Sequence, residues 1–257
     1  MATSSKFAAY AGGATGARAA ARAGSAIVVV DAFRASATIS VLVSKGARVV
    51  PVASIEDAAS ATSDYRLGER GSVKVAGFDF GNSPTEVFDA NIPPGSTIAL
   101  STTNGTRVIE AAAGAPVIFV GSFVNATALA DAIHDEGIEL VTVIGCGWEG
   151  RRSSEDEAAA GAVLHRLEER GARPDERARR VMDAYLSRPV ERLRGNSAAR
   201  RLRRLGYERD IGFCLAEDTV PAVPRLVDGA FIEGCKRGAS MCEISGPWAC
   251  PKSQNSS

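Results

Sequence analysis

Histidine, the side chain that most often acts as a catalytic base or metal ligand near neutral pH, is nearly absent from this sequence. The 257 residues contain two, His134 and His165. Both fall in segments with the apolar spacing of amphipathic helices, where a histidine usually has a structural role. The sequence therefore disfavours a histidine nucleophile and a histidine-rich metal site.

Cysteine offers no framework either. The five cysteines are an odd number and include no C-x-x-C pair, which disfavours a set of structural disulfides. The last three, Cys235, Cys242 and Cys250, do not follow a zinc-binding spacing.

Long apolar runs and an excess of one charge are also missing. No apolar run approaches the roughly 20 residues that span a bilayer, and the N-terminus lacks a signal-peptide pattern. Thirty basic residues balance thirty acidic ones. We therefore expect a cytoplasmic protein that binds neither membrane nor nucleic acid, while homo-oligomer formation stays open.

One segment departs from this balance. Residues 177–209 contain eleven arginines against three acidic residues. Aromatic side chains do not interleave with these arginines, so a pair of solvated basic helices is favoured over a nucleic-acid surface.

The body of the chain alternates between strand-like and helix-like segments. Apolar runs typical of strands lie at 27–30, 48–52, 73–76, 97–100, 117–120 and 140–144. Between them, Ser54, Ser83 and Ser153 stand where a helix N-cap is expected. This alternation predicts an α/β fold whose sheet is largely parallel or mixed, with helices on both faces.

Composition divides the chain into three parts. Residues 1–25 are rich in Ala, Gly, Ser and Arg, and we expect a poorly ordered N-terminal arm there. Residues 26–234 form the expected α/β domain, and residues 235–257 an irregular C-terminal tail.

Polar residues follow the predicted strands at four places. Asp31 and Arg34 follow the first strand, the run 101–107 ("STTNGTR") another, Asn125 a third, and the run 145–156 ("GCGWEGRRSSED") a fourth. If the strands are parallel, all four groups lie at one edge of the sheet, where ligands of open α/β sheets bind. Hydroxyls, amides and glycines before a helix favour an anion site.

Acidic residues in the same regions suggest a metal. Several carboxylates supply the hard oxygen ligands that Mg²⁺ prefers, usually one or two together with water. Taken singly, each carboxylate is more often a helix cap or a surface ion pair.

The spacing of Cys146 and Arg152 raises an alternative. C-x5-R between a strand and a helix is typical of a phosphatase loop with a cysteine nucleophile, which needs a thiolate of low pKa. Glu149, Glu155 and Asp156 lie too near for that, because negative charge beside a bound phosphate is costly.

Six segments resemble one known family in order and spacing. They are "VVVDAFRASATI", "LGERG…VAGFDFGNSPTE", "STTNGTR", "VGSFVNATALA", "GCGWEGRRSSEDEAAAGAV" and "GYERDIGFCLAED…VPRL". Together they resemble the 2-phosphosulfolactate phosphatase family over about residues 26–232. The resemblance implies an α/β fold of its own topology and a Mg²⁺-dependent acid phosphatase. Such an enzyme hydrolyses 2-phospho-3-sulfolactate to sulfolactate and phosphate on the pathway to coenzyme M.

Two points of this resemblance stay open. The helix before "GYERD" is unusually rich in arginine, and the substrate here could be another 2-phosphorylated hydroxy acid. A homologue that binds the anion without catalysis, and the cysteine-nucleophile enzyme using Cys146 and Arg152, are the alternatives.

The resemblance and the residue chemistry together assign roles to the polar residues. The expected catalytic residues are Asp31, Arg34, Asn104 and Asp156. The expected Mg²⁺ ligands come from Asp31, Glu69, Glu155 and Asp156. The expected substrate-binding residues are Arg70, Asn82, Ser83, Thr102, Thr103, Gly105, Thr106, Arg107, Asn125, Cys146 and Gly147.

Two expectations concern how these residues work. Arg34, Arg70 and Arg107 are expected to hold the anionic groups of the substrate with their planar guanidinium groups. The nucleophile is water or the Asp31 carboxylate, and a role of Asp31 as metal ligand is favoured.

Overall fold

The computed structural model describes residues 6–234 of the chain. The expected C-terminal tail at 235–257 lies outside the described residues, as do residues 1–5. In the described part, no helix is both long and apolar enough to span a bilayer.

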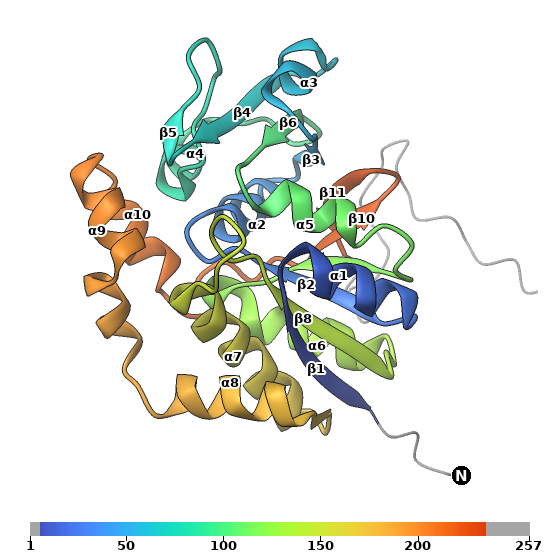
Figure 1. Cartoon of the computed structure of the whole chain (residues 1–257). Helices are drawn as coiled ribbons and strands as arrows, with labels where there is room; N and C mark the ends of the chain where they lie inside the picture. Colours follow the sequence, from blue (N-terminus) through green and yellow to red (C-terminus); the bar gives the residue numbers. More distant parts are fainter. Residues whose placement is uncertain (1–5, 235–257) are drawn as a thin grey trace, which may run out of the picture.

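The described residues form one mixed sheet of eleven strands (Figure 1). The strands are β1 (Phe7–Gly12), β2 (Ala26–Val30), β3 (Arg48–Pro51), β4 (Tyr65–Arg70), β5 (Val73–Lys74), β6 (Thr97–Ser101), β7 (Ile118–Val120), β8 (Leu140–Gly145), β9 (Arg173–Pro174), β10 (Pro224–Val227) and β11 (Ala230–Glu233). Their order is β5-β4-β6-β3-β11-β10-β7-β2-β8-β1-β9. The α/β fold with a mixed sheet is therefore confirmed.

The sheet contains two parallel blocks that run in opposite directions. One block is β4-β6-β3, and the other is β7-β2-β8-β1-β9. Three antiparallel pairings, through the hairpin β10–β11, separate β3 from β7. The condition for all four polar strand ends to share one edge, parallel strands throughout, is therefore not met: β6 belongs to one block, and β2, β7 and β8 belong to the other.

Helices cover both faces of the sheet. They are α1 (Gly13–Arg22), α2 (Ala35–Ser44), α3 (Ile55–Ser60), α4 (Pro84–Asp89), α5 (Gly105–Ala111), η1 (Phe123–Asn125), α6 (Ala126–Asp135), α7 (Ser154–Glu169), α8 (Glu176–Leu186), η2 (Val190–Gly195), α9 (Ser197–Arg204) and α10 (Glu208–Cys214). Alternate residues of β2 feed two cores. Val28 and Val30 pack in the core that includes residues of α6, α7 and α8, and Ile27 and Val29 pack with α1, α2 and α5. Burial on both faces explains why β2 is continuously apolar.

The N-terminal segment is a correction. Residues 7–22 are not a poorly ordered arm: β1 pairs in parallel with β8 and β9, and α1 packs against β1. The residues are small because the packing is close. A Cβ on Gly16 would lie 2.7 Å from the Cβ of Ala11. Packing therefore overrides the weak strand propensity of alanine.

The three expected N-caps are confirmed. At the starts of α3, α4 and α7, the hydroxyl groups of Ser54, Ser83 and Ser153 each accept a hydrogen bond from the backbone N–H of the residue three positions later.

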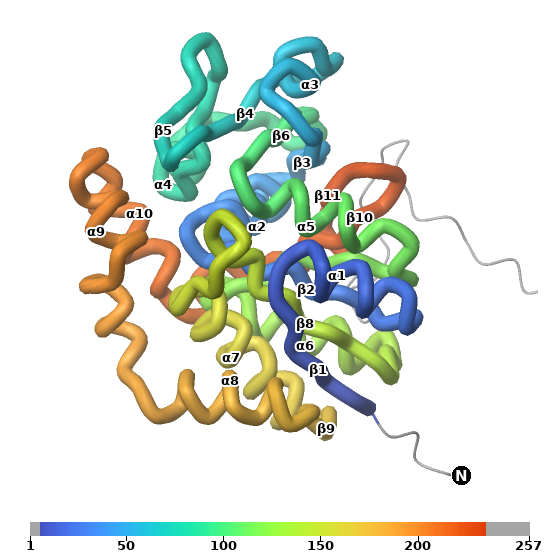
Figure 2. The backbone as a smooth tube through the Cα atoms, viewed as in Figure 1, coloured from blue at the N-terminus to red at the C-terminus, as the bar shows by residue number. Residues whose placement is uncertain are grey.

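Figure 2 shows that the chain folds into an upper part, with α3, α4 and β3 to β6, and a lower part around β1, β2 and β8.

A substitution in β1 tests the correction. Ala8 is buried and Phe7 is 50% exposed. Ala8→Glu should lower the free energy of unfolding in urea by about 3 kcal/mol or more, because it buries an unpaired charge. The control, Phe7→Glu, should lower it by less than about 1 kcal/mol. Equal, small effects of the two substitutions would contradict the buried position of β1 and support a poorly ordered N-terminal arm.

Candidate active site

Four carboxylates from distant parts of the chain meet between the two parallel blocks. Asp31 follows β2, Glu69 lies near the end of β4, and Glu155 and Asp156 begin α7. Burial raises the pKa of Asp31, and the charges of Glu69 and Glu155 raise it further. Burial also raises the pKa of Asp156, and the charges of Asp31 and Glu155 add to this. The four carboxylates are therefore near enough to influence one another electrostatically, and we call them the acidic cluster.

Sheet twist explains how opposed strands deliver residues to one place. Six strand pairings separate β4 from β2. At the usual rotation of about 20–25° per pair, the direction turns by roughly 120–150°. This rotation offsets most of the reversal between the two blocks, so their carboxyl ends converge.

Asp31 is the most accessible member of the acidic cluster: it is half-buried, whereas the other three are buried. Burial, and then the charge of Glu69, raises the pKa of Asp31 to about 7, although the backbone N–H of Ala35 lowers it. Gly105, at the start of α5, lies close to Thr102, because a Cβ there would be 3.1 Å from the Thr102 hydroxyl oxygen and in contact with Oδ2 of Asp31. Burial and the neighbouring carboxylates therefore outweigh the favourable contacts of Asp31 and favour its protonated form.

Asp156 and Glu69 hold loops in place. Asp156 accepts hydrogen bonds from the backbone N–H groups of Ala32 and Gly147, each at 2.8 Å. Glu69 accepts bonds from the backbone N–H and the hydroxyl of Thr103, at 2.8 and 2.7 Å. Each carboxylate thus ties together loops that follow different strands.

The turn after Glu69 is equally specific. Gly71 and Ser72 both have positive φ, 60° and 72°, and they form the two-residue loop between β4 and β5. The other oxygen of Glu69 accepts the backbone N–H of Ser72 at 2.7 Å. The hairpin therefore sets the orientation of the Glu69 carboxylate.

Arg34 does not have the expected role. It is 2% exposed, and its Nη1 donates to Asp210 Oδ2 at 2.6 Å. Its Nη2 donates to the carbonyl of Ser72 at 2.9 Å, and its guanidinium lies over the ring of Tyr207, 4.1 Å from the centroid. Arg34 is therefore a positioning residue that joins α2, the β4–β5 turn and α10, and not a free fork for substrate.

Two expected substrate-binding residues also serve the framework. The Ser83 hydroxyl donates to Asp210 at 2.7 Å. The side-chain oxygen of Asn125 accepts the backbone N–H of Ser122, and its amide donates to the carbonyls of Val120 and Ala222. The polar groups of Ser83 and Asn125 are thus engaged by other residues of the protein.

Two of the six buried side-chain polar atoms that lack a hydrogen-bond partner in the described residues belong to expected substrate-binding residues. The hydroxyl of Thr102 and the side-chain oxygen of Asn82 make no hydrogen bond in the described structure, although both residues are under 5% exposed. A buried polar atom without a partner is uncommon and indicates a missing ligand or water. Both residues were expected to bind substrate, and Thr102 borders the cavity described below that also borders Asp31.

The remaining expected residues lie around the start of α5. Arg70 is exposed, and its Nη2 donates to the Ser101 hydroxyl at 3.1 Å. Arg107 is exposed on α5. The oxygen of Asn104 accepts the backbone N–H of Glu149 at 3.3 Å, and the Thr106 hydroxyl donates to the backbone of Thr102. Arg70 and Arg107 are thus the two expected arginines open to an anion.

Cys146 is unsuited to nucleophilic attack. Burial and the charges of Asp31 and Asp156 raise the pKa of its thiol well above the usual value. Arg152 points away to Glu157, with its side chain 77% exposed. The C-x5-R spacing therefore does not form a thiolate site here.

Comparison with known proteins agrees with this arrangement. A family model described as 2-phosphosulpholactate phosphatase matches residues 15–229. The chain belongs to the 2-phosphosulfolactate phosphatase family. The members of this family are classed as phosphoric monoester hydrolases. The match begins at residue 15, before the expected residue 26, and so includes most of α1.

Curated relatives cover most of the chain. A "Probable 2-phosphosulfolactate phosphatase" of Gloeobacter violaceus is 39% identical over 217 residues, which is 80% of this chain and 91% of the relative. A protein of the same name from Thermotoga petrophila is 40% identical over 212 residues, covering 80% of this chain and 90% of the relative.

The acidic cluster offers carboxylates for a Mg²⁺ site of few protein ligands, but not for a site built from protein side chains alone. In residues 6–234, no group of three or more His, Cys, Asp or Glu side chains is arranged to hold a metal ion. Mg²⁺ needs fewer, because it binds one or two carboxylates together with water and substrate phosphate. A cavity of about 10 Å³ borders Asp31, Thr102 and Gly105, which is room for about one water. Asp31 is the one member of the acidic cluster that borders this cavity.

The ion pair of Arg34 and Asp210 gives a prediction. Asp210→Asn should lower the free energy of unfolding in urea by about 3–5 kcal/mol, because it leaves the buried Arg34 without its counter-charge. The control, Asp89→Asn, breaks an exposed pair with Arg209 and should cost less than about 1 kcal/mol. Similar small losses in both variants would show that Arg34 is not anchored as described.

Proposed function

We propose that this chain is a Mg²⁺-dependent phosphatase that hydrolyses 2-phospho-3-sulfolactate or a related 2-phosphorylated hydroxy acid. The observation that carries the proposal is the acidic cluster at Asp31, next to a buried hydroxyl without a partner, that of Thr102. The names of the curated relatives support this substrate class.

The metal would be held by Asp31, with Glu155 next to it. Glu155 uses one carboxylate oxygen to accept a bond from Asn196 at 2.8 Å. When bound, Mg²⁺ neutralises charge on the phosphate and on the carboxylates. Asp156 and Glu69 keep the loops around the metal in position through their backbone contacts.

Arg70 and Arg107 bind the anionic groups of the substrate. A 2-phosphorylated sulfo acid carries a phosphate, a carboxylate and a sulfonate, and planar guanidinium groups recognise such oxygens through paired hydrogen bonds. The Thr102 hydroxyl and the Asn82 amide supply further polar contacts. Phosphoryl transfer depends mostly on such positioning and charge neutralisation.

Hydrolysis breaks the bond between phosphorus and the oxygen on carbon 2. Water supplies the oxygen that attacks phosphorus, and the released alkoxide takes a proton to give the hydroxy acid. We assign Asp31 to the metal and not to the attack, since it is central to a cluster of like charges that a cation stabilises.

Metal removal tests the function. Purified protein should lose phosphatase activity on 2-phosphosulfolactate in EDTA and recover it with MgCl₂. Cys146→Ser should retain activity within about threefold, whereas Asp31→Asn should lose at least about a hundredfold in kcat.

Two results would contradict this account. Full activity after rigorous metal removal, together with loss of activity in Cys146→Ser, would support the cysteine nucleophile. Binding of the substrate without turnover at any metal concentration would identify a non-catalytic anion-binding homologue.

Substrate choice gives a second prediction. Arg70→Lys and Arg107→Lys should each lower kcat/KM for 2-phosphosulfolactate roughly ten- to a hundredfold, because a charge-assisted contact is worth about 1.5–3 kcal/mol. Activity on ethyl phosphate should change less. The control, Arg18→Lys on the exposed side of α1, should behave as the wild type on both substrates. Equal losses on both substrates would mean that these arginines do not select the carboxylate or sulfonate.

A further inference from the structure

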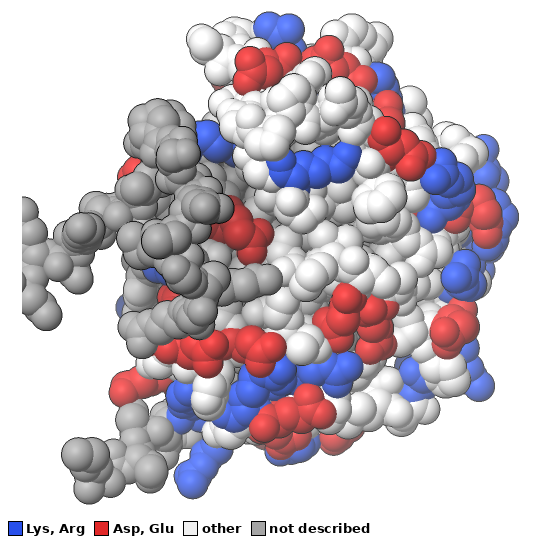
Figure 3. Space-filling view, turned by 180° about the vertical axis from the view of Figure 1, so that it is seen from behind, with Lys and Arg blue, Asp and Glu red and all other residues white. Residues whose placement is uncertain are grey.

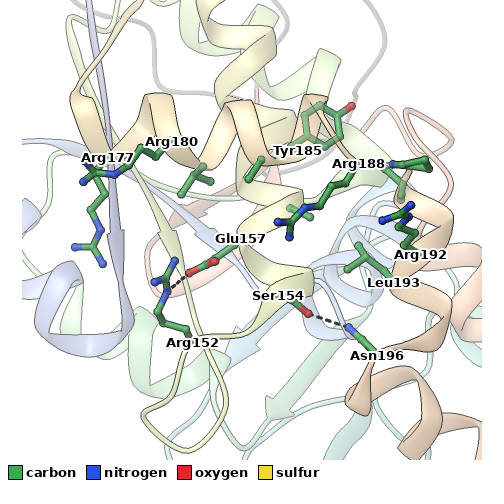
Figure 4. A pocket seen from close by; sticks show the side chains of 15 residues that line it. Arg152, Ser154, Glu157, Arg177, Arg180, Tyr185, Arg188, Arg192, Leu193 and Asn196 are labelled. Atoms are coloured by element: carbon green, nitrogen blue, oxygen red, sulfur yellow. Dashed lines mark hydrogen bonds and ion pairs between the residues drawn. The ribbon is translucent and has the colours of Figure 1, made fainter.

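A second and larger cavity lies outside the acidic cluster. It has a volume of about 630 Å³ and lies between α7, α8 and η2 (Figure 4). None of the four clustered carboxylates lines it. Five arginines do, and they come from the β8–α7 loop, α8 and the segment that follows α8: Arg152, Arg177, Arg180, Arg188 and Arg192. We call it the arginine cavity.

Most of the positive charge in the arginine cavity has no acidic partner. Glu157 is the one acidic residue that lines it, and it pairs with Arg152. Arg180 pairs with Glu176. The guanidinium groups of Arg188 and Arg192 form no hydrogen bond or ion pair with any residue in the part of the chain that the structure describes.

Other arginines of the same segment behave differently. Arg179 pairs with Glu168 and Arg203 with Glu208. On the visible part of the opposite face, basic and acidic side chains are interspersed (Figure 3). Arg200, Arg201 and Arg204 of the same segment also form no ion pair in residues 6–234, but they do not line the cavity. The arginine cavity is therefore distinguished by three arginines without an acidic partner, Arg177, Arg188 and Arg192, that line one hollow.

The arginine cavity also has an apolar side. Val181, Ala184, Val190 and Leu193 line it, together with Tyr185. Its volume lies within the range of small-molecule sites and exceeds what a three-carbon phosphate ester fills. Arginines around an apolar wall suit a ligand with several anionic groups and a less polar body.

A wall of hydrogen bonds separates the arginine cavity from the acidic cluster. Asn196 and Ser154 line the cavity. Asn196 Nδ2 donates to Glu155 at 2.8 Å and the Ser154 hydroxyl donates to the same carboxylate oxygen at 3.2 Å. The two sites are thus neighbours with different chemistry, one acidic and one basic.

We infer that the arginine cavity binds a polyphosphate anion of about nucleotide size, either a nucleoside triphosphate or an inorganic polyphosphate. Guanidinium groups bind phosphate oxygens in pairs, and Arg177, Arg188 and Arg192 have no acidic partner in the described residues that would compete with such a ligand. The volume of the cavity and its apolar wall favour a small molecule over a nucleic-acid strand. This site is independent of the proposed hydrolysis.

Calorimetric titration of the full chain tests the inference, in EDTA and 150 mM salt so that the metal does not take part. The probes are ATP, tripolyphosphate, orthophosphate and adenosine. Tripolyphosphate and ATP should bind at least tenfold more tightly than orthophosphate, and adenosine should not bind measurably. ATP binding that is more than threefold tighter than tripolyphosphate identifies the nucleotide as the ligand class, and equal affinity identifies the inorganic chain.

Paired variants locate the binding. Arg188→Gln with Arg192→Gln should weaken tripolyphosphate binding at least tenfold and leave the thermal unfolding midpoint unchanged. The control, Arg173→Gln with Arg204→Gln, removes the same charge from exposed positions outside the cavity and should change binding less than twofold. Equal weakening in both variants, binding unaffected by either, or tighter binding of a single-stranded RNA oligonucleotide that depends on Arg173 and Arg204 would overturn the proposal.

Discussion

The concentration of negative charge at Asp31 is the constraint on which the rest of this site depends. Four carboxylates cannot be gathered from three parts of the chain unless something offsets their repulsion. Backbone N–H groups do so in part. Asp156 accepts those of Ala32 and Gly147, and Glu69 accepts those of Ser72 and Thr103. This compensation is incomplete, since burial and the neighbouring carboxylates still raise the pKa of Asp156 well above its usual value and that of Asp31 to about 7.

A buried ion pair keeps the two parallel blocks in register around this charge. Arg34 follows β2, which belongs to one parallel block. Its guanidinium binds Asp210 of α10 and the carbonyl of Ser72, which lies in the turn after β4 of the other block. The upper part also contacts α10 through the rings of Phe88 and Phe213, 5.6 Å apart. Arg34 therefore holds α10 and the β4–β5 turn in place beside the acidic cluster, and this explains why a charged residue that follows a core strand is buried.

Sequence patterns predicted the elements whose signals are local. The apolar run of β2 and the serine caps of α3, α4 and α7 were found because each depends on a few adjacent residues. The pattern missed β1, β4, β9, β10 and β11. In β1 the alanines have weak strand propensity, and in β4 the charged residues and Gly68 interrupt the apolar run, so these two strands are selected by packing. The partner of Arg34 lies 176 residues away, so no local signal could separate an ion pair from a substrate contact.

Thermal and urea unfolding of the metal-free wild type and Asp31→Asn, at pH 5 and pH 8, tests the acidic cluster most directly. The fold raises the pKa of Asp31 from 3.8 to about 7, so it favours the protonated form, and this contribution to stability is lost as pH rises through 7. The free energy of unfolding of Asp31→Asn, relative to that of the wild type, should therefore rise by roughly 2–3 kcal/mol between pH 5 and pH 8. MgCl₂ at pH 8 should stabilise the wild type and not the variant. Parallel pH profiles, with equal stabilisation by MgCl₂, would contradict a metal-binding cluster centred on Asp31.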